Sequence, residues 1–330
     1  MKISFFEVAQ WEKSVLQNKF PDANFTEDKL MEENVSGYKE SEIISCFIYS
    51  DLSEKVLSKF ENLKFITVRG TGFDNIDQEY CKNHNIKISN VPEYGSRTVA
   101  EYTFALILNL TRKIYQSINQ SKVLDFNHSN LRGIDLYGKT IGIIGFGKIG
   151  KNVAEIARGF GMKIIVSTRT KDEKHEQEFG LEHKDLGELL QTSDIVTLHL
   201  PLTPETKHII NQDNILNFKK GSYLINTARG GLIDTEAVIL GLEKNILGGV
   251  ALDVLEEEKE LTEEAEVLTS RFKKEADYET LFMNHILLNH PKVLITPHNA
   301  FNSNEALARI TQSTIGNIEA YLEGNPKNLV

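Results

Sequence analysis

The stretch Ile141–Gly150 reads IGIIGFGKIG, and it decides the fold of the larger part of the chain. The apolar run IGII is typical of a short buried strand, and it leads into glycines with the spacing G-x-G-x-x-G, after which the composition is helical. The first glycine, Gly145, permits a tight turn, Gly147 lets the backbone approach a pyrophosphate, and Gly150 brings helix and strand close together. The stretch therefore predicts a dinucleotide-binding turn between the first strand and the first helix of a nucleotide-binding domain.

Strand-like and helical stretches alternate on both sides of this turn. From the turn onward, apolar runs predict strands at Ile141–Ile144, Lys163–Ser167, Ile195–Leu198, Tyr223–Asn226, Gly248–Leu252 and Val293–Ile295. Before it, the expected elements are a first strand within MKISFFEVAQW, strands at Ile43–Tyr49, Lys64–Val68 and Ile86–Ser89, and helices near Ser53–Phe60, Ile76–Asn83 and Thr98–Ser121. A last helix is expected at Ser303–Leu322. This alternation predicts an α/β fold with doubly wound parallel sheets and right-handed crossovers.

The composition narrows the class of protein. The chain has 330 residues, 40% hydrophobic and 25% charged, which is typical of a globular protein of roughly two domains. Its formal net charge of -10 argues against nucleic acid as the partner, because phosphate binding needs a basic face. No apolar run approaches the roughly 18 residues of a membrane span, and the N-terminus is too interrupted for a signal peptide. We therefore expect a cytoplasmic protein with no membrane partner, and buried thiols at Cys46 and Cys81.

The strand after the glycine turn ends without the acidic residue that is usual there. Ile164–Thr170 reads IIVSTRT, so Thr168 and Arg169 stand where Asp or Glu would accept hydrogen bonds from the adenine ribose. The threonine removes a charge that would repel a 2′-phosphate, and the arginine adds donors that grip one. The sequence therefore favours NADP(H). The alternative is NAD(H), with Arg169 stacked on the adenine.

Three further segments each follow a predicted strand and carry a reactive side chain. They are NTARGG (Asn226–Gly231), ALDVLEEE (Ala251–Glu258) and TPHNAF (Thr296–Phe301). Because parallel strands end at one edge of a sheet, these segments should meet where open α/β sheets bind ligands. An arginine grips a carboxylate, a histidine exchanges a proton near neutral pH, and a carboxylate beside that histidine raises its pKa. This set of groups is what the reduction of a 2-oxo acid needs.

These segments, with VRGTGFDNID, NVPEYGSRTVAEYTFALIL, GFGKIG, HLPLTPETKHIIN and LINTARGGLIDTEAV, resemble the D-isomer-specific 2-hydroxyacid dehydrogenases. The resemblance runs from about Leu63 to Ala308. It implies a Rossmann cofactor domain, residues 101–301, inserted into a flavodoxin-like substrate domain made of residues 1–100 and 302–330. It also implies a homodimer, for which the helix near Thr98–Ser121 would suit the interface.

The resemblance implies roles for individual residues. Arg229 would bind and polarise the substrate, His298 would be the acid and base, and Glu258 would pair with the imidazole. With the residues argued above, the cofactor contacts are Thr98, Gly145, Gly147, Lys148, Ile149, Gly150, Thr168, Arg169, Leu200, Pro201, Thr206, Thr227, Ala228, Arg229, Asp253 and His298. The substrate contacts are Gly70, Thr71 and Gly72, which would offer backbone N–H groups, together with Tyr94, Arg229, His298 and Phe301.

Within the family, two kinds of small 2-oxo acid stay open as the substrate. Phe301 and Tyr94 match aromatic positions of the D-lactate dehydrogenase branch, and the long separation between Glu258 and His298 also resembles that branch. Pyruvate reduced to D-lactate is therefore the first expectation. The strand end at Thr168 and Arg169 instead resembles glyoxylate or hydroxypyruvate reductases. An interpretation from another class is a nucleotide-sensing corepressor that binds peptides, which would bind the cofactor but show no turnover.

Apart from Glu258, the acidic stretch 256–285 and two further histidines are not assigned a catalytic role. The acidic stretch 256–285 is interpreted as a solvated helix or, alternatively, as a flap beside the site. Within it Glu256 and Glu257 are expected to be solvated, since the spacing from Asp253 selects Glu258. His199 is interpreted as a neighbour of the cofactor and His208 as a surface residue. Neither histidine has a metal-ligand partner at suitable spacing, so no metal site is expected.

Overall fold

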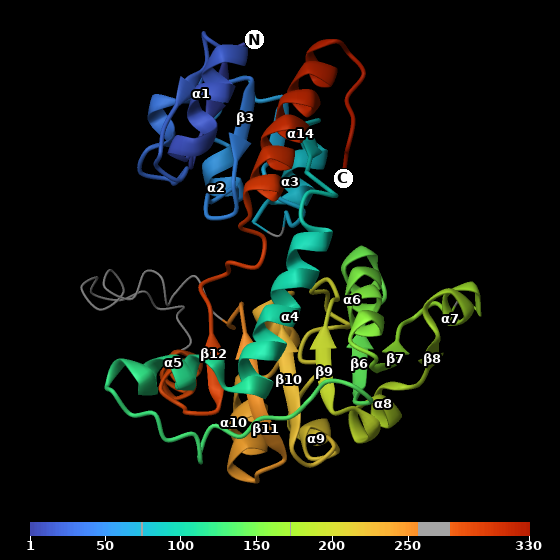
Figure 1. Cartoon of the computed structure of the whole chain (residues 1–330). Coiled ribbons are helices and arrows are strands. Elements are labelled where there is room, and N and C mark those ends of the chain that lie inside the picture. Colours follow the sequence, from blue (N-terminus) through green and yellow to red (C-terminus); the bar gives the residue numbers. More distant parts are fainter. Residues whose placement is uncertain (74, 172, 257–277) are drawn as a thin grey trace. The chain divides into compact units, whose positions relative to one another are not determined.

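The computed structural model describes residues 1–73, 75–171, 173–256 and 278–330. The chain divides into two compact units, Met1–Gly95 with Asn302–Val330, and Ser96–Phe301 (Figure 1). The first segment of the substrate domain was expected to end at residue 100, but the first unit ends at Gly95. The boundary is earlier because α4 (Ser96–Arg112) belongs wholly to the second unit. Each unit is built around its own parallel sheet, so the fold is α/β with two doubly wound domains.

The first unit has a five-stranded sheet of flavodoxin-like order, β2-β1-β3-β4-β5. Its strands are β1 (Ile3–Phe5), β2 (Asn24–Phe25), β3 (Ile43–Cys46), β4 (Phe65–Val68) and β5 (Lys87–Ser89). Its helices are α1 (Gln10–Lys19), α2 (Glu54–Leu57), α3 (Gln78–Asn83) and α14 (Asn304–Leu322), with a short 3₁₀ turn, η1 (Val35–Gly37). The expected strands are confirmed, whereas β2 was not expected because its two residues carry no alternating pattern.

The last helix of the chain completes the first unit. In α14, Ile318 is buried with Ile3 and Phe5 of β1. The ring of Tyr321 stacks on Phe65 of β4 with centroids 4.2 Å apart. Figure 1 shows this helix, in red, returning to the blue N-terminal segments of the same unit. Burial of these apolar side chains explains why residues so distant in sequence fold together.

The second unit has a seven-stranded sheet of order β12-β11-β10-β9-β6-β7-β8. Its strands are β6 (Thr140–Ile144), β7 (Lys163–Ser167), β8 (Leu181–His183), β9 (Ile195–Leu198), β10 (Ser222–Asn226), β11 (Leu247–Leu252) and β12 (Val293–Ile295). Its helices are α4, α5 (Ile114–Lys122), α6 (Lys148–Gly159), α7 (Glu173–Phe179), α8 (Leu186–Thr192), α9 (Gln212–Ile215), α10 (Thr235–Glu243) and α13 (Tyr278–Leu288), with η2 (Gly230–Leu232). The strand order reverses between β6 and β9, which is the switch point of a Rossmann domain.

Strand β6 is buried on both faces of this sheet. Ile144 belongs to one apolar cluster, while Ile141 and Ile143 belong to the other. Alternate side chains of a strand point to opposite faces, so the run IGII supplies apolar contacts to the helices on both sides. The strands predicted for this unit are therefore confirmed, and only the short edge strand β8 was missed.

The single long helix expected over Thr98–Ser121 is wrong, since the structure breaks it into α4 and α5. Lys113, between the two, has a left-handed φ of 51°. The carbonyl of Thr111 accepts a hydrogen bond from Ile134 N at 2.9 Å, and Asn109 Oδ1 accepts one from Tyr115 N at 2.9 Å. A returning loop and a side chain thus satisfy groups that a continuous helix would have used internally.

The acidic stretch 256–285 is described only at its two ends. Glu256 precedes the gap, and α13 follows it, with Leu281, Asn284 and Leu287 buried. This end of the stretch is a packed helix and not a solvated one. The interpretation of the stretch as a flap falls on residues 257–277, which lie outside the described residues. Among the described helices, none is both long enough and apolar enough to cross a membrane.

Candidate active site

The strands of the second unit end in register at one edge of the sheet. Ser167 of β7 pairs with Ile144 of β6, and Ile144 pairs with Leu198 of β9. On the other side Leu198 pairs with Asn226, Asn226 with Leu252 and Leu252 with Ile295. The segments that follow these strands therefore start side by side, and they contain most of the site residues expected from the sequence.

The glycine turn after β6 has the shape that a pyrophosphate needs. Gly145 has a φ of 94°, and a Cβ there would lie 2.5 Å from the carbonyl oxygen of His199. At Gly150 a Cβ would lie 2.3 Å from the carbonyl oxygen of Gly145. At Gly147 nothing lies within 4 Å of the position a Cβ would occupy. The outer glycines thus close the turn, while Gly147 leaves open space at the N-terminus of α6, where backbone N–H groups bind phosphates.

The end of β7 lies beside this turn. Gly145 N donates to Ser167 O at 2.9 Å, so Thr168 and Arg169 leave the sheet next to the glycines. Thr168 is half-buried and Arg169 is exposed. Glu205 lies close enough to Arg169 to feel its charge: the pKa of Glu205 is lowered, chiefly by a hydrogen bond from the Thr203 hydroxyl and in smaller part by the Arg169 guanidinium. A carboxylate therefore stands near the arginine, although no acid occupies the strand end.

The loop after β9 carries further expected cofactor contacts. The Thr206 hydroxyl donates to Pro201 O at 2.7 Å, and Thr206 Oγ1 accepts from Thr203 N at 2.8 Å, which closes the loop around Leu200. His199 begins this loop, and its imidazole contacts the Thr197 hydroxyl at 3.0 Å. Burial lowers the pKa of His199 to about 3, so this ring is neutral.

The loop after β10 fixes the backbone on both sides of Arg229. The buried amide of Asn226 accepts from Ala228 N at 3.0 Å and donates to Arg229 O at 2.8 Å. Thr227 is tied to α4 through a 3.0 Å contact between its hydroxyl and that of Thr103. The sequence analysis named Thr227, Ala228 and Arg229 but missed Asn226, whose position at the strand end was its only signal.

Asp253, directly after β11, holds the loop that carries His298. Its carboxylate accepts hydrogen bonds from the Thr296 hydroxyl, from Asn299 N at 2.9 Å and from Ala300 N at 2.8 Å. Its carbonyl accepts from His298 N at 2.9 Å. Burial raises the pKa of Asp253, and these hydrogen bonds oppose the shift. His298 has a left-handed φ of 49°, and the ring of Phe301 meets its imidazole edge-on with centroids 6.2 Å apart.

The remaining expected cofactor residues lie on elements of the same unit. Thr98 lies on α4, and Lys148 and Ile149 lie in the first turn of α6.

The expected substrate residues of the first unit form a separate, tightly bonded loop after β4. The Thr71 hydroxyl donates to Val91 O at 2.9 Å, and Asn90 donates to Thr71 O at 2.7 Å. Val91 N also donates to Gly70 O at 2.9 Å, so the segment Gly70, Thr71 and Gly72 is hydrogen-bonded to the segment after β5. Tyr94 lies on the segment after β5, which also contains Asn90 and Val91, and its carbonyl accepts from Arg309 Nε at 2.6 Å.

Glu258, the expected partner of His298, lies outside the described residues. Its neighbour Glu256 is described, and the expectation that Glu256 is solvated is wrong. His208 Nε2 donates to its carboxylate at 2.5 Å, and the side chain of Glu256 is only 14% exposed. His208 is therefore not a free surface residue either. No sequence pattern predicts this pair, because His208 and Glu256 lie 48 residues apart in the chain.

A model of a protein family matches the part of the chain that contains this sheet edge. It is described as "D-isomer specific 2-hydroxyacid dehydrogenase, NAD binding domain", and it matches residues 104–300. The chain belongs to the D-isomer-specific 2-hydroxyacid dehydrogenases, a family of oxidoreductases, and its second unit contains the NAD-binding domain of that family.

Individual relatives resemble the chain along nearly its whole length. A 2-hydroxyacid dehydrogenase A of Aspergillus oryzae is 36% identical over 98% of this chain and 92% of the relative. A glyoxylate reductase of Aeropyrum pernix is 32% identical over 90% of this chain and 84% of the relative. The crystal structure of a D-lactate dehydrogenase from Aquifex aeolicus, complexed with NAD and lactic acid, is 34% identical and has a TM-score of 0.87. It covers 98% of this chain, and the match spans 96% of that protein.

Proposed function

We propose that the protein reduces a small 2-oxo acid to the D-2-hydroxy acid with a reduced nicotinamide cofactor, and that pyruvate is its substrate. The observation that carries this proposal is the common sheet edge, where Arg229 follows β10 and His298 follows β12, on either side of β11. Asn226 and Asp253 hold these two loops by hydrogen bonds. The glycine turn lies at the same edge.

In this proposal each side chain has one task. Arg229 binds the carboxylate of the 2-oxo acid through its guanidinium and polarises the oxo group. His298, protonated, donates its proton to the oxo oxygen, and Glu258 stabilises the imidazolium. A reduced nicotinamide cofactor held at the turn of Gly145, Gly147 and Gly150 would supply the hydride that the carbonyl carbon accepts. Gly70, Thr71 and Gly72 offer backbone N–H groups to the substrate carboxylate.

Two observations support pyruvate over larger 2-oxo acids. Phe301 lies edge-on to the imidazole of His298, so a substrate held by His298 would have an aromatic ring beside it, as a small side chain requires. A structural relative is a D-lactate dehydrogenase with lactic acid bound. The alternative is glyoxylate or hydroxypyruvate, which the strand end at Thr168 and the Aeropyrum pernix relative favour.

The proposed cofactor is NADP(H), with NAD(H) as the alternative. Thr168 and Arg169 leave the sheet beside the glycine turn, and neither would repel a 2′-phosphate. Glu205 near Arg169 opposes this preference, because its charge competes for the guanidinium. We therefore expect Glu205→Gln to lower the KM for NADPH, and Arg169→Ala to raise it, with little change in the KM for NADH.

The proposed assembly is a homodimer formed through α5 and the loop after it. This segment exposes Ile118 at 50%, Leu124 at 82% and Phe126 at 76%. Contiguous exposed apolar side chains of this kind usually mark a contact surface between proteins.

The test is reductase activity on pyruvate, glyoxylate, hydroxypyruvate and branched 2-oxo acids, with NADH and with NADPH. We expect the highest kcat/KM with pyruvate, and His298→Gln and Arg229→Ala should each lower it by about 100-fold or more. His84→Gln, on an exposed histidine of the first unit, is the matched control and should leave it unchanged. Wild-type protein that binds the cofactor but reduces none of these acids would contradict the proposal and favour a binding protein.

A further inference from the structure

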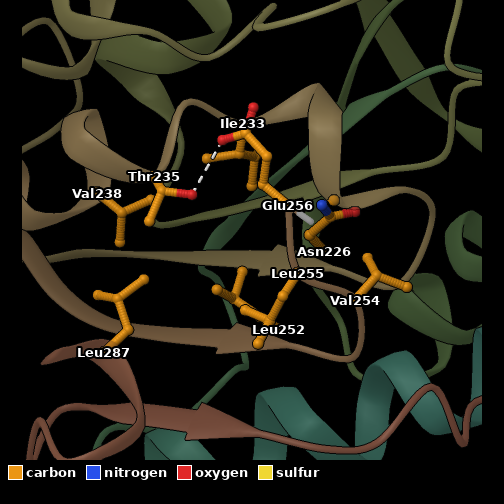
Figure 2. Close-up of a pocket in the computed structure, with 10 residues that line it drawn as sticks. Asn226, Ile233, Thr235, Val238, Leu252, Val254, Leu255, Glu256 and Leu287 are labelled. Atoms are coloured by element: carbon orange, nitrogen blue, oxygen red, sulfur yellow. Dashed lines mark hydrogen bonds between the residues drawn. The ribbon is translucent and has the colours of Figure 1, made fainter. Parts of the chain in front are cut away.

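After β11, the carboxylate of Glu256 is held by His208, from the segment after β9, and by Thr235, the first residue of α10. His208 Nε2 donates to one carboxylate oxygen at 2.5 Å, and the Thr235 hydroxyl donates to the other at 3.0 Å. Figure 2 shows the bond between Thr235 and Glu256, two of the residues that line a small hollow. The hollow has a volume of about 10 Å³, which is near that of a single water probe.

The backbone of Glu256 is fixed as well as its side chain. Asn284 of α13, which is fully buried, donates from its amide to Glu256 O at 2.8 Å. His208, for its part, donates from its backbone N–H to Gly231 O at 2.9 Å. Glu256 and His208 therefore join the segments that follow β9, β10 and β11, and a charge-assisted hydrogen bond is the link between them.

The loop after β11 packs against the loop after β10 directly beside Arg229. A Cβ on Gly230 would lie 1.9 Å from the carbonyl oxygen of Leu255 and 2.5 Å from the backbone nitrogen of Glu256. The two backbones thus touch where only a glycine fits. Since Gly230 directly follows Arg229, whatever fixes Leu255 and Glu256 also fixes the place from which the guanidinium extends.

We propose that Glu256 is a positioning residue for Arg229. Its carboxylate, held by His208 and Thr235, keeps the loop after β11 seated on Gly230 and so sets the position of the arginine that binds the substrate carboxylate. This inference rests on the proposed function, because the role of Arg229 as substrate anchor is part of that proposal. It adds a second His–Glu pair, distinct from the proposed pair of His298 and Glu258.

The experiment is a double-mutant cycle on Glu256→Ala and His208→Ala, with Glu236→Ala as the control. Glu236 is an exposed carboxylate on α10, next to Thr235 in sequence. Each single variant should raise the KM for the 2-oxo acid and lower kcat/KM by about 10-fold to 100-fold, as expected for a misplacement of about 1 Å. The double variant should be no worse than the single ones, because both remove the same link. The Kd for the reduced nicotinamide should stay at the wild-type value, and His208→Gln, which keeps a donor, should recover most of the activity.

Three results would overturn the inference. The first is a kcat/KM of Glu256→Ala and of His208→Ala equal to that of Glu236→Ala. The second is a loss of kcat/KM in the double variant equal to the two single losses combined. The third is a weaker Kd for the reduced nicotinamide that accompanies the loss of kcat/KM. If Glu256→Ala does not fold, Thr235→Val and His208→Ala, which each remove one bond to the carboxylate, are compared singly with Glu236→Ala, and kcat/KM values equal to the control in both would overturn the inference. Failure of the proposed function is a different result, since wild-type protein would then show no turnover, or Arg229→Ala would retain it.

Discussion

Asp253 illustrates how one buried carboxylate can organise a site at the scale of the residue. It is 1% exposed and accepts hydrogen bonds from the loop that carries His298. The resemblance placed Asp253 among the cofactor contacts, and the structure adds its hydrogen bonds to the loop of His298. The sequence revealed the residue through its place after a strand, but its partners lie more than forty residues away, as the Asn299 bond shows.

Replacing Asp253 should therefore reduce turnover. Asp253→Asn puts an amide N–H₂ where one of the carboxylate oxygens now accepts hydrogen bonds, so the His298 loop should move. We expect kcat to fall by about 100-fold. Thr296→Ser, which keeps the hydroxyl bonded to Asp253, is the matched control. A kcat of Asp253→Asn equal to that of Thr296→Ser would refute the assignment.

From the buried imidazole of His199 we predict that the free energy of unfolding falls at acid pH. Burial lowers the pKa of its imidazole to about 3, whereas in the unfolded chain it lies near 6.5. Between these values the unfolded chain binds the extra proton, so the free energy of unfolding falls as the pH is lowered below about 6.5, by at most ~1.4 kcal/mol per pH unit for this one proton. The measurement is denaturant unfolding of wild type and His199→Asn, followed by circular dichroism from about pH 7.5 down to about pH 5. Equal slopes for the two proteins would argue against a neutral, buried ring.

At the scale of the element, the glycines of the turn meet two different requirements. Gly145 is needed for the turn to fold, and Gly147 leaves room for a cofactor. Gly145 needs its positive φ and its lack of a Cβ for folding, because the His199 carbonyl lies against it. Gly147 has an extended backbone, with φ -78°, and open space where a Cβ would be, so folding alone does not require a glycine there.

Alanine substitutions should separate these requirements. Gly145→Ala should cost about 1–3 kcal/mol of stability or more, from the strained φ and the clash together. Gly147→Ala should leave the thermal midpoint near wild type but weaken binding of the reduced nicotinamide about 10-fold, because the methyl group enters the space a pyrophosphate would approach. Thermal unfolding and fluorescence titration measure the two effects. Unchanged cofactor affinity in Gly147→Ala would contradict the placement of the pyrophosphate at this turn.

The elements that the sequence predicted well are those whose pattern is local. Buried parallel strands read as apolar runs, and the strands from β6 onward were recognised that way apart from β8. The break between α4 and α5 was missed, because it depends on Ile134 and Asn109 bonding to the chain near Lys113 and not on any helix-breaking residue there.

At the scale of the whole molecule, the proposed homodimer predicts a change in mass when its apolar surface is charged. Ile118→Asp combined with Leu124→Asp should convert the wild-type dimer to a monomer, measured by light scattering after gel filtration. Val15→Asp, which places the same charge on an exposed apolar position of α1, is the control and should leave the mass unchanged. A monomeric wild-type protein would contradict the proposal.

The sequence by itself determined the fold class and the strand ends that Arg229, Asp253 and His298 follow. Glycine spacing, apolar runs and strand ends are local features, and backbone geometry converts them directly into a turn, a sheet and a shared edge. Only the tertiary structure decided which side chains hold that edge together. The contacts of Glu256 with His208, and of Asp253 with the His298 loop, join residues far apart in the chain. Such contacts depend on how the loops pack, and a one-dimensional pattern carries no record of that packing.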